Sequence, residues 1–215
     1  MKKRRSPLPT WYDLIAPIYD RAIRGLYLPY RRLAMQALDL RPGLTVLDLG
    51  CGSGLNFELI LAQIGPRGTL IGVDLSAEML RRAQRKVDDH GWTNVRLLRQ
   101  DVRLLERSDI QGLVGEDHQV DRVFCTLGLT VFPDWETVLA GSFDLLAKGG
   151  RYCIMDLHND QANVYTRLIN VLARSEIARR VWEPLQARCI DYRQESHPLM
   201  HGSGTIIVAS GAARG

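Results

Sequence analysis

The amino-acid sequence predicts a single α/β domain built on a mostly parallel, Rossmann-like sheet. Short apolar runs alternate with segments of helical period along the chain, which is the order typical of βαβ units. A glycine-rich loop, residues 50–54, directly follows the first of these runs. The 215 residues, 46% of them hydrophobic and 24% charged, are enough for one well-buried domain over residues 1–215.

The parallel part of the sheet is expected to contain five strands, at residues 44–49, 69–73, 95–98, 120–125 and 151–155. Helices with one apolar face are expected between and after them, over 55–64, after the N-cap residue Ser76, around 135–146 and over 163–182. Two final strands, 189–195 and 204–210, are expected to form an antiparallel hairpin at one edge of the sheet. Residues 103–119 fit neither pattern.

A basic, aromatic segment precedes the sheet. Residues 11–28 mix arginines with aromatic and apolar residues, and an amphipathic helix is expected to begin near Pro29. We therefore divide the domain into an amphipathic helical lid at residues 1–40 and a cofactor-binding core at residues 41–215, with the lid over the carboxyl edge of the sheet.

Composition excludes several classes of protein. The four cysteines are scattered without a CxxC pair, so the sequence predicts neither a metal site nor a disulfide framework. The net charge is +4, but arginine is spread along the whole chain, so no nucleic-acid partner is indicated. No apolar stretch approaches the roughly 20 residues that span a bilayer. We expect a cytoplasmic protein, or one that lies peripherally at the inner face of the membrane.

The glycine loop and the acidic residues around it predict a nucleotide-type ligand. Gly50, Gly52 and Gly54 lie where an open parallel sheet binds ligands, and glycine lets the backbone approach a ligand closely. Asp74 follows the second strand, where a carboxylate can accept hydrogen bonds from two ribose hydroxyls. Asp101 follows the third strand and could accept from an adenine amino group or cap the next segment.

A dinucleotide is the alternative ligand at this loop. The dinucleotide pattern GxGxxG has its third glycine where this chain has Leu55, and Asp48 adds negative charge where a pyrophosphate would approach. That charge is compatible with the ammonium group of S-adenosylmethionine. The loop and its acids therefore favour S-adenosylmethionine over NAD.

At these motifs the chain resembles the Class I S-adenosylmethionine-dependent methyltransferases. Residues 46–54 (VLDLGCGSG), 72–80 (GVDLSAEML) and 146–151 (LAKGGR) are similar to motifs of that family. The resemblance implies strand order 3-2-1-4-5-7-6, with the last strand antiparallel, and helices on both faces. From the motifs and the resemblance together we expect donor contacts at Asp48, Gly50, Cys51, Gly52, Ser53, Gly54, Asp74, Leu75, Met79, Asp101, Val102, Thr126 and Leu127.

The methyl acceptor is indicated only by the lid. Residues 12–20 (YDLIAPIYD) resemble the same segment of bacterial phospholipid N-methyltransferases and of ubiquinone/menaquinone C-methyltransferases. That resemblance implies that Tyr19 reaches the active site, although a packed lid aromatic has the same pattern. We expect a lipid or lipid-like acceptor, with phosphatidylethanolamine N-methylation first and quinone-type or other small-molecule C- or O-methylation as the alternative. An oxidoreductase or a binding-only protein is more remote.

His158 is the second candidate catalytic residue, because it directly follows the carboxyl end of the fifth strand. A histidine at such a place is often structural instead. Other side chains expected to face the acceptor are Asp156, Asp160, Tyr192, His197 and His201.

The composition of the lid predicts binding to an anionic membrane surface. Aromatic residues among arginines suit the headgroup level of a bilayer. The purified protein should sediment with anionic liposomes and be released as salt rises, because salt screens exposed charges. Deleting residues 1–10 should weaken sedimentation and leave donor affinity intact. Sedimentation that is absent, or indifferent to salt, would contradict the membrane prediction.

Overall fold

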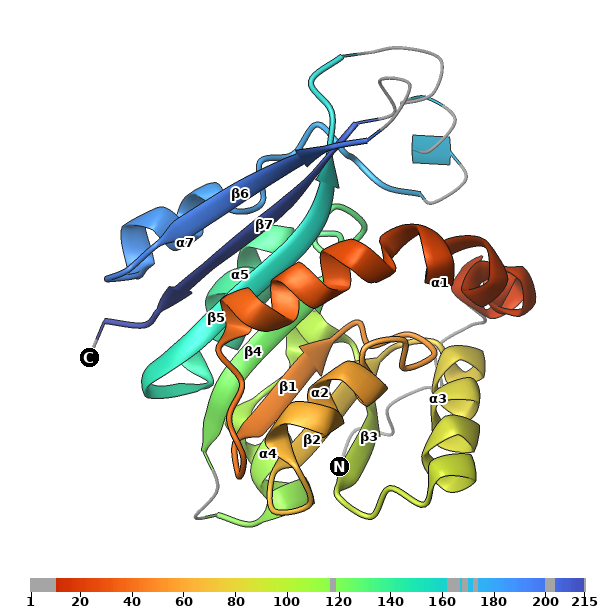
Figure 1. The fold of residues 1–215 in the computed structure, drawn as a ribbon, viewed down its shortest axis with the longest axis vertical. Helices are drawn as coiled ribbons and strands as arrows, with labels where there is room; N and C mark the ends of the chain where they lie inside the picture. The colour runs from red at the N-terminus through yellow and green to blue at the C-terminus, as the bar shows by residue number, and fades with distance from the viewer. Residues whose placement is uncertain are drawn as a thin grey trace.

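The computed structural model describes residues 11–116, 119–161, 167, 170–171, 174–199 and 204–214, with side chains from residue 25 onward. Seven strands form one sheet in the order β3-β2-β1-β4-β5-β7-β6, and only β7 runs antiparallel to its neighbours (Figure 1). The strands are β1 Thr45–Leu49, β2 Thr69–Asp74, β3 Val95–Arg99, β4 Val120–Thr126, β5 Leu146–His158, β6 Arg193–Pro198 and β7 Thr205–Ala212. The predicted fold class and strand order are confirmed.

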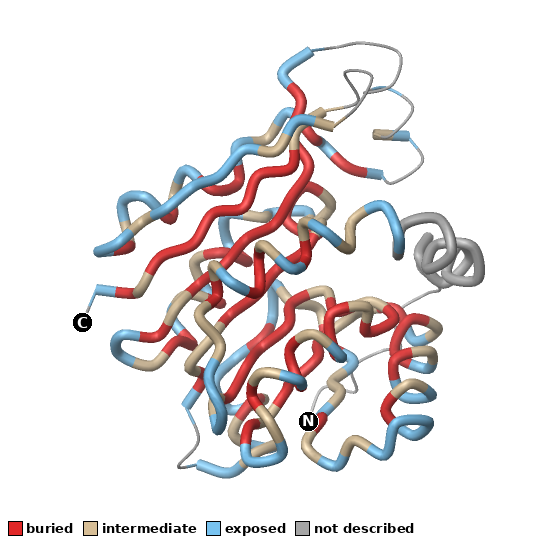
Figure 2. The backbone as a smooth tube through the Cα atoms, in the orientation of Figure 1, coloured by how far each residue is buried: buried red, intermediate tan, exposed pale blue. Residues whose placement is uncertain are grey.

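Helices cover both faces of the sheet, and each face has its own apolar core. One face carries α1 (Trp11–Leu38), α2 (Phe57–Ile64) and α3 (Ala77–His90); the other carries α4 (Arg107–Val114), α5 (Trp135–Asp144) and α7 (Glu183–Arg188). The central strands are therefore buried on both sides, as Figure 2 shows, and β1 is buried throughout. This is why these strands are continuous apolar runs in the sequence.

Helix α1 is longer than predicted. It is one helix from Trp11 to Leu38, with Pro17 and Pro29 inside it, so the prediction that a helix begins near Pro29 is wrong. Its second half belongs to the core, because Ala34 and Leu38 have no exposed surface. Packing against β5 and β7 stabilises this half of the helix. The preference of proline for the first turn of a helix therefore does not decide where α1 starts.

The C-terminal hairpin lies further along the chain than predicted. Of the residues expected to open the first strand, Cys189 follows the end of α7 and makes only an isolated bridge to Ala213, and residues 190–191 form a bend. The cause is Asp191, whose carboxylate accepts a hydrogen bond from the backbone N–H of Ala212 at 2.6 Å. This bond takes the place of a ladder bond, so β6 begins only at Arg193.

Two further segments depart from the sequence prediction. Residues 103–119, left unassigned, contain the end of a 3-10 turn (Val102–Leu104) and α4. The helix expected over 163–182 is wrong for residues 175–182, which form turns, and most of residues 162–173 lie outside the described set. No helix among the described residues is long and apolar enough to cross a membrane.

Candidate functional site

A cavity of about 490 Å³ lies at the carboxyl ends of β1 to β4. Nine of the predicted donor-binding residues line it: Gly50, Gly52, Asp74, Leu75, Met79, Asp101, Val102, Thr126 and Leu127. Other lining residues were not predicted: Ser76, Gln100, Arg103, Gly128, Val131, Phe132, Pro133 and Arg174. Half of the latter, Gly128, Val131, Phe132 and Pro133, come from the loop after β4, which has no motif of its own.

The glycine loop turns tightly and leaves room on its cavity side. Gly50, Gly52 and Gly54 have φ angles of 63°, 55° and 77°, a conformation that only glycine adopts readily. A Cβ atom at Gly52 would meet no protein atom within 4 Å, so a side chain there would project into open space. At Gly50 a Cβ atom would lie 2.7 Å from the ring of Phe132. The loop can thus hold a ligand against its backbone.

Asp74 joins the glycine loop to the start of α3. Its carboxylate accepts hydrogen bonds from the backbone N–H groups of Gly52 and Ser76, each at 2.8 Å. Ser76 in turn caps α3 by accepting from the N–H of Met79 at 3.1 Å, as predicted. The Asp74 side chain lines the cavity, and a carboxylate is a suitable acceptor for ribose hydroxyls.

Asp101 has the expected capping role and also lies at the cavity. It lines the cavity, and it caps the 3-10 turn by accepting from the N–H of Arg103 at 3.0 Å. The guanidinium of Arg103 also binds both carboxylate oxygens, which lowers the pKa of Asp101. Arg103 reaches Asp134 at 3.4 Å as well, so this outer wall of the cavity is a charged cluster.

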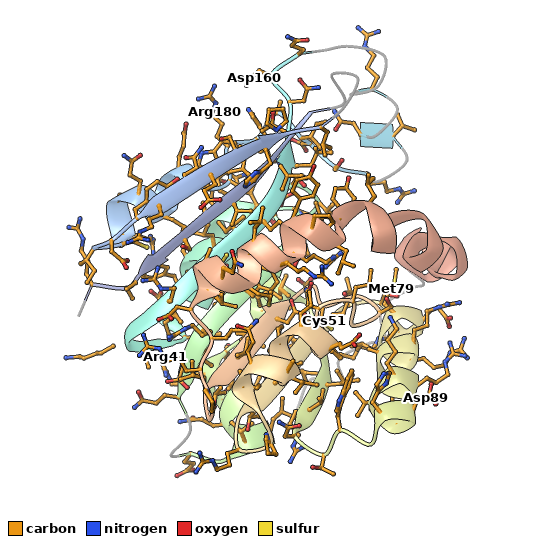
Figure 3. The ribbon with its side chains drawn as sticks, viewed as in Figure 1. Arg41, Cys51, Met79, Asp89, Asp160 and Arg180 are labelled. Carbon is orange, nitrogen blue, oxygen red and sulfur yellow. The ribbon has the colours of Figure 1, made fainter. Side chains whose placement is uncertain are left out.

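Four of the predicted donor-binding residues lie behind the cavity wall: Asp48, Cys51, Ser53 and Gly54. Cys51 packs beneath the loop, where burial raises its thiol pKa, and Ser53 lies 3.3 Å from Lys86 Nζ (Figure 3 labels Cys51 and Met79). Gly54 adjoins the ring of Phe57. These residues support the loop, and their side chains do not form the cavity surface.

Asp48 lies in a buried polar cluster. Its carboxylate has no exposed surface and accepts hydrogen bonds from Asn56 Nδ2 at 3.1 and 3.2 Å. Asn56 Nδ2 also donates to Thr126 Oγ1 at 2.9 Å, and Asn56 Oδ1 accepts from Arg31. Burial raises the pKa of Asp48 to about 7, against the opposing effects of Asn56 and Arg31. Arg31 and Asn56 belong to no motif in the sequence.

Asp156 and His158 lie within β5, which runs three residues further than predicted, and the side chains at this end of the strand are mostly engaged within the protein. Asp156 is buried and accepts from the hydroxyl of Thr130 at 2.8 Å and from its N–H at 3.2 Å, and burial raises its pKa to about 6. His158 Nδ1 lies 3.0 Å from the carbonyl oxygen of Ile177, and Nε2 lies 3.1 Å from Asp160. The His158 ring also packs edge-on against the ring of Trp182. His158 is therefore held by contacts within the protein.

The remaining acceptor-side candidates do not meet in one place. The Tyr192 hydroxyl donates to Gln194, and the His197 ring contacts Tyr30 at 5.9 Å. The side chain of Tyr19 and the whole of His201 lie outside the described residues. Tyr27 is one of the lid aromatics whose side chain the structure describes. Burial raises the pKa of its hydroxyl, and the carboxylate of Asp156 raises it further.

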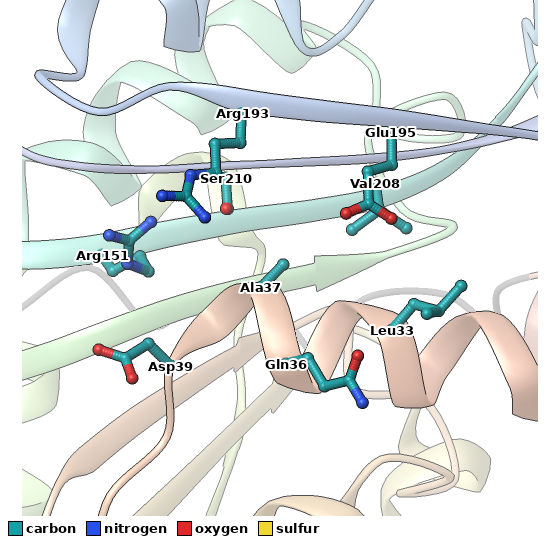
Figure 4. A pocket seen from close by; sticks show the side chains of 9 residues that line it. All are labelled: Leu33, Gln36, Ala37, Asp39, Arg151, Arg193, Glu195, Val208 and Ser210. Atoms are coloured by element: carbon teal, nitrogen blue, oxygen red, sulfur yellow. The ribbon is translucent and has the colours of Figure 1, made fainter.

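A second cleft, of about 400 Å³, lies between α1 and β6 (Figure 4). Arg151, Arg193, Glu195 and Asp39 contribute charges of both signs to its walls. It shares no lining residue with the cavity at the glycine loop. Ligands of open parallel sheets bind at the carboxyl ends of the strands, so we assign the functional site to the cavity at the loop. Among the described residues no group of three metal-binding side chains occurs.

Comparison with known proteins supports this assignment. Residues 46–150 match the family described as "Methyltransferase domain". The chain is 31% identical over 140 residues to nocamycin O-methyltransferase of Saccharothrix syringae, which covers 65% of this chain but only 47% of that relative. It is 26% identical over 167 residues to demethylmenaquinone methyltransferase of Listeria welshimeri, with 76% of this chain and 67% of that relative covered.

A solved structure has the same fold. It is geranyl diphosphate C-methyltransferase from Streptomyces coelicolor A3(2), in complex with S-adenosyl-L-homocysteine. The TM-score is 0.69 at 16% identity, and the match covers 86% of this chain and 75% of that one.

Replacing Asp74 should weaken donor binding. We expect Asp74→Ala to raise the dissociation constant of S-adenosylhomocysteine at least tenfold, about 1.4 kcal/mol, because the ribose loses its acceptor and the loop loses an anchor. Titration calorimetry measures this. Asp89→Asn, which removes an exposed charge from the far end of α3, is the matched control. Equal affinities in the two variants would remove Asp74 from the site.

The buried carboxylate of Asp48 predicts a pH dependence of stability. Its pKa rises from 3.8 to about 7 on folding, so the folded chain keeps a proton that the unfolded chain has lost. This retained proton contributes to the free energy of unfolding. The contribution is complete below pH 3.8 and is lost as pH rises through about 7. Urea denaturation between pH 5.5 and 8 (roughly the range over which Asp48 ionises) should show this loss. Asp48→Asn should make the slope shallower, and an unchanged slope would contradict the assignment.

Proposed function

Because residues 46–150 form a Class I, S-adenosylmethionine-dependent methyltransferase domain, we propose that the whole protein methylates a carbon or oxygen atom of a lipophilic small molecule of quinone or related type. We infer the class of acceptor from one observation, which is the apolar wall of the donor cavity next to Thr126. The loop after β4 contributes the apolar side chains Leu127, Val131, Phe132 and Pro133 to that wall.

The residues that would hold the donor are those of the cavity. We propose that the glycine loop holds the methionine part of S-adenosylmethionine, that Asp74 accepts from the ribose, and that Asp101 and Met79 adjoin the adenine. The sulfonium of the donor is already activated, so the protein contributes mainly proximity and alignment. The open space over Gly52 is consistent with this placement.

An amine acceptor is less compatible with the charges beyond β5. An ammonium headgroup would need an accessible carboxylate, but Asp156 is buried and bonded to Thr130. Asp160 lies within ion-pair distance of His158 and of Arg180, at 3.1 and 3.3 Å. The relatives compared above are a nocamycin O-methyltransferase and a demethylmenaquinone methyltransferase. These observations support quinone-type or other small-molecule methylation over phosphatidylethanolamine N-methylation.

Peripheral contact with an anionic membrane is part of this proposal, since quinones and related molecules partition into bilayers. Leu26 of α1 is 56% exposed and would add apolar area to the basic N-terminal segment. We propose a position at the inner face of the membrane for this reason.

A transfer assay tests the acceptor class. Radiolabelled S-adenosylmethionine would be incubated with the protein and a total lipid extract, which is then separated into quinone, phenolic and phospholipid fractions. We expect label in the quinone or phenolic fraction, with Asp74→Ala giving the background. Label confined to phosphatidylethanolamine would overturn the proposal and restore N-methylation.

A further inference from the structure

Helix α1 is joined to the donor cavity by a chain of buried polar side chains, and we propose that Arg31 and Asn56 in this chain are positioning residues for methyl transfer. They would hold α1 in one register over the carboxyl edge, so that the acceptor site is formed only when the donor site is in place. This inference rests on the proposed function and extends it to residues outside the cavity.

The chain runs without interruption from α1 to β4. Arg31 Nη1 donates to Asn56 Oδ1, and Asn56 Nδ2 donates to the Asp48 carboxylate and to Thr126 Oγ1. The exposed fractions are 5% for Arg31, 3% for Asn56 and 0% for Asp48. Water therefore does not compete for these bonds, and each group depends on its protein partners.

The amide of Asn56 fits its position chemically. A guanidinium can only donate hydrogen bonds, and the Asp48 oxygens accept from Asn56 Nδ2, so the two partners fix which end of the amide faces each. An aspartate at 56 would turn a second carboxyl group toward Asp48. A leucine would leave Arg31 and Asp48 without this bridge. The bridge thus explains why a polar residue occupies the N-cap of α2 without forming a side-chain cap bond.

These buried hydrogen bonds connect α1 to the donor site. Among the described residues, none of α1 lines the cavity, whereas Thr126 does. Tyr27 lies four residues before Arg31, on the same face of the helix. Tyr27 packs against the apolar core that contains Met155 and Leu157 of β5, so fixing Arg31 also fixes the turn of α1 that packs on this strand.

Hydrogen exchange of α1 tests the coupling without any acceptor. Backbone amides of residues 27–38 would be followed by mass spectrometry with and without S-adenosylhomocysteine, in the parent, in Arg31→Met and in Arg32→Met. Arg32 is exposed on the same helix, so its variant controls for loss of charge and helix propensity. We expect the ligand to slow exchange at least threefold in the parent and in R32M, but not in R31M.

Affinity and rate separate positioning from simple loss of structure. R31M should bind S-adenosylhomocysteine within about threefold of the parent, because Arg31 does not line the cavity. Its single-turnover transfer rate at saturating donor should fall at least tenfold, with R32M unchanged. Parent-like protection of α1 in R31M, or the same loss in R32M, would overturn the proposal.

Two conservative variants keep the test decisive if R31M does not fold. Arg31→Lys still donates to Asn56 Oδ1 and should retain most of the protection of α1. Asn56→Asp still accepts from Arg31 but cannot donate to Asp48, and should lose it. Equal protection in R31K and N56D would overturn the proposal. Protection that follows this pattern while the parent methylates no quinone or phenol would retain the coupling and reject only the acceptor class.

Discussion

The site is arranged around one constraint, which is the fully buried carboxylate of Asp48 near the end of β1. Asp48 lies on the face of β1 that α1 and α2 cover, because side chains alternate along a strand and its neighbour Leu47 belongs to the opposite core. An unpaired buried charge is costly, so three elements supply polar groups at this point. Arg31 comes from α1, Asn56 from the start of α2, and Thr126 from the end of β4.

The acidic residues at the carboxyl edge have separate structural tasks. Asp74 is bonded to backbone N–H groups and faces the cavity. Asp156 is turned toward the α5 side of the sheet, where its bonds to Thr130 hold the loop after β4. That loop supplies Phe132, whose ring closes over Gly50, so Asp156 shapes the donor cavity from a distance. A carboxylate that lies near the end of a strand in the sequence does not for that reason alone bind a small molecule.

The sequence predicted the fold well because its strongest signals are local. Apolar runs, the glycine loop and the acids after β1 to β3 are each readable within a few residues, and they led to the fold class and to part of the cavity wall. The strand order came from the resemblance to the methyltransferase family. Phe132, Arg103 and Asn56 could not be found this way, since their roles depend on partners far along the chain or on loop conformations without a motif. The start of β6 was misplaced for the same reason, because Asp191 makes its bond to Ala212, on another strand.

The two ends of α1 are held differently. Arg122 on β4 donates to the carbonyl oxygens of Leu38 at 2.8 Å and of Asp39 at 3.0 Å, which fastens the C-terminal end of the helix to the sheet. Only five residues (40–44) separate Asp39 from Thr45, the first residue of β1, so this end has little slack. Because Arg122 and the cavity residue Thr126 lie on the same strand, the C-terminal end of α1 is fixed to the strand that forms part of the donor cavity.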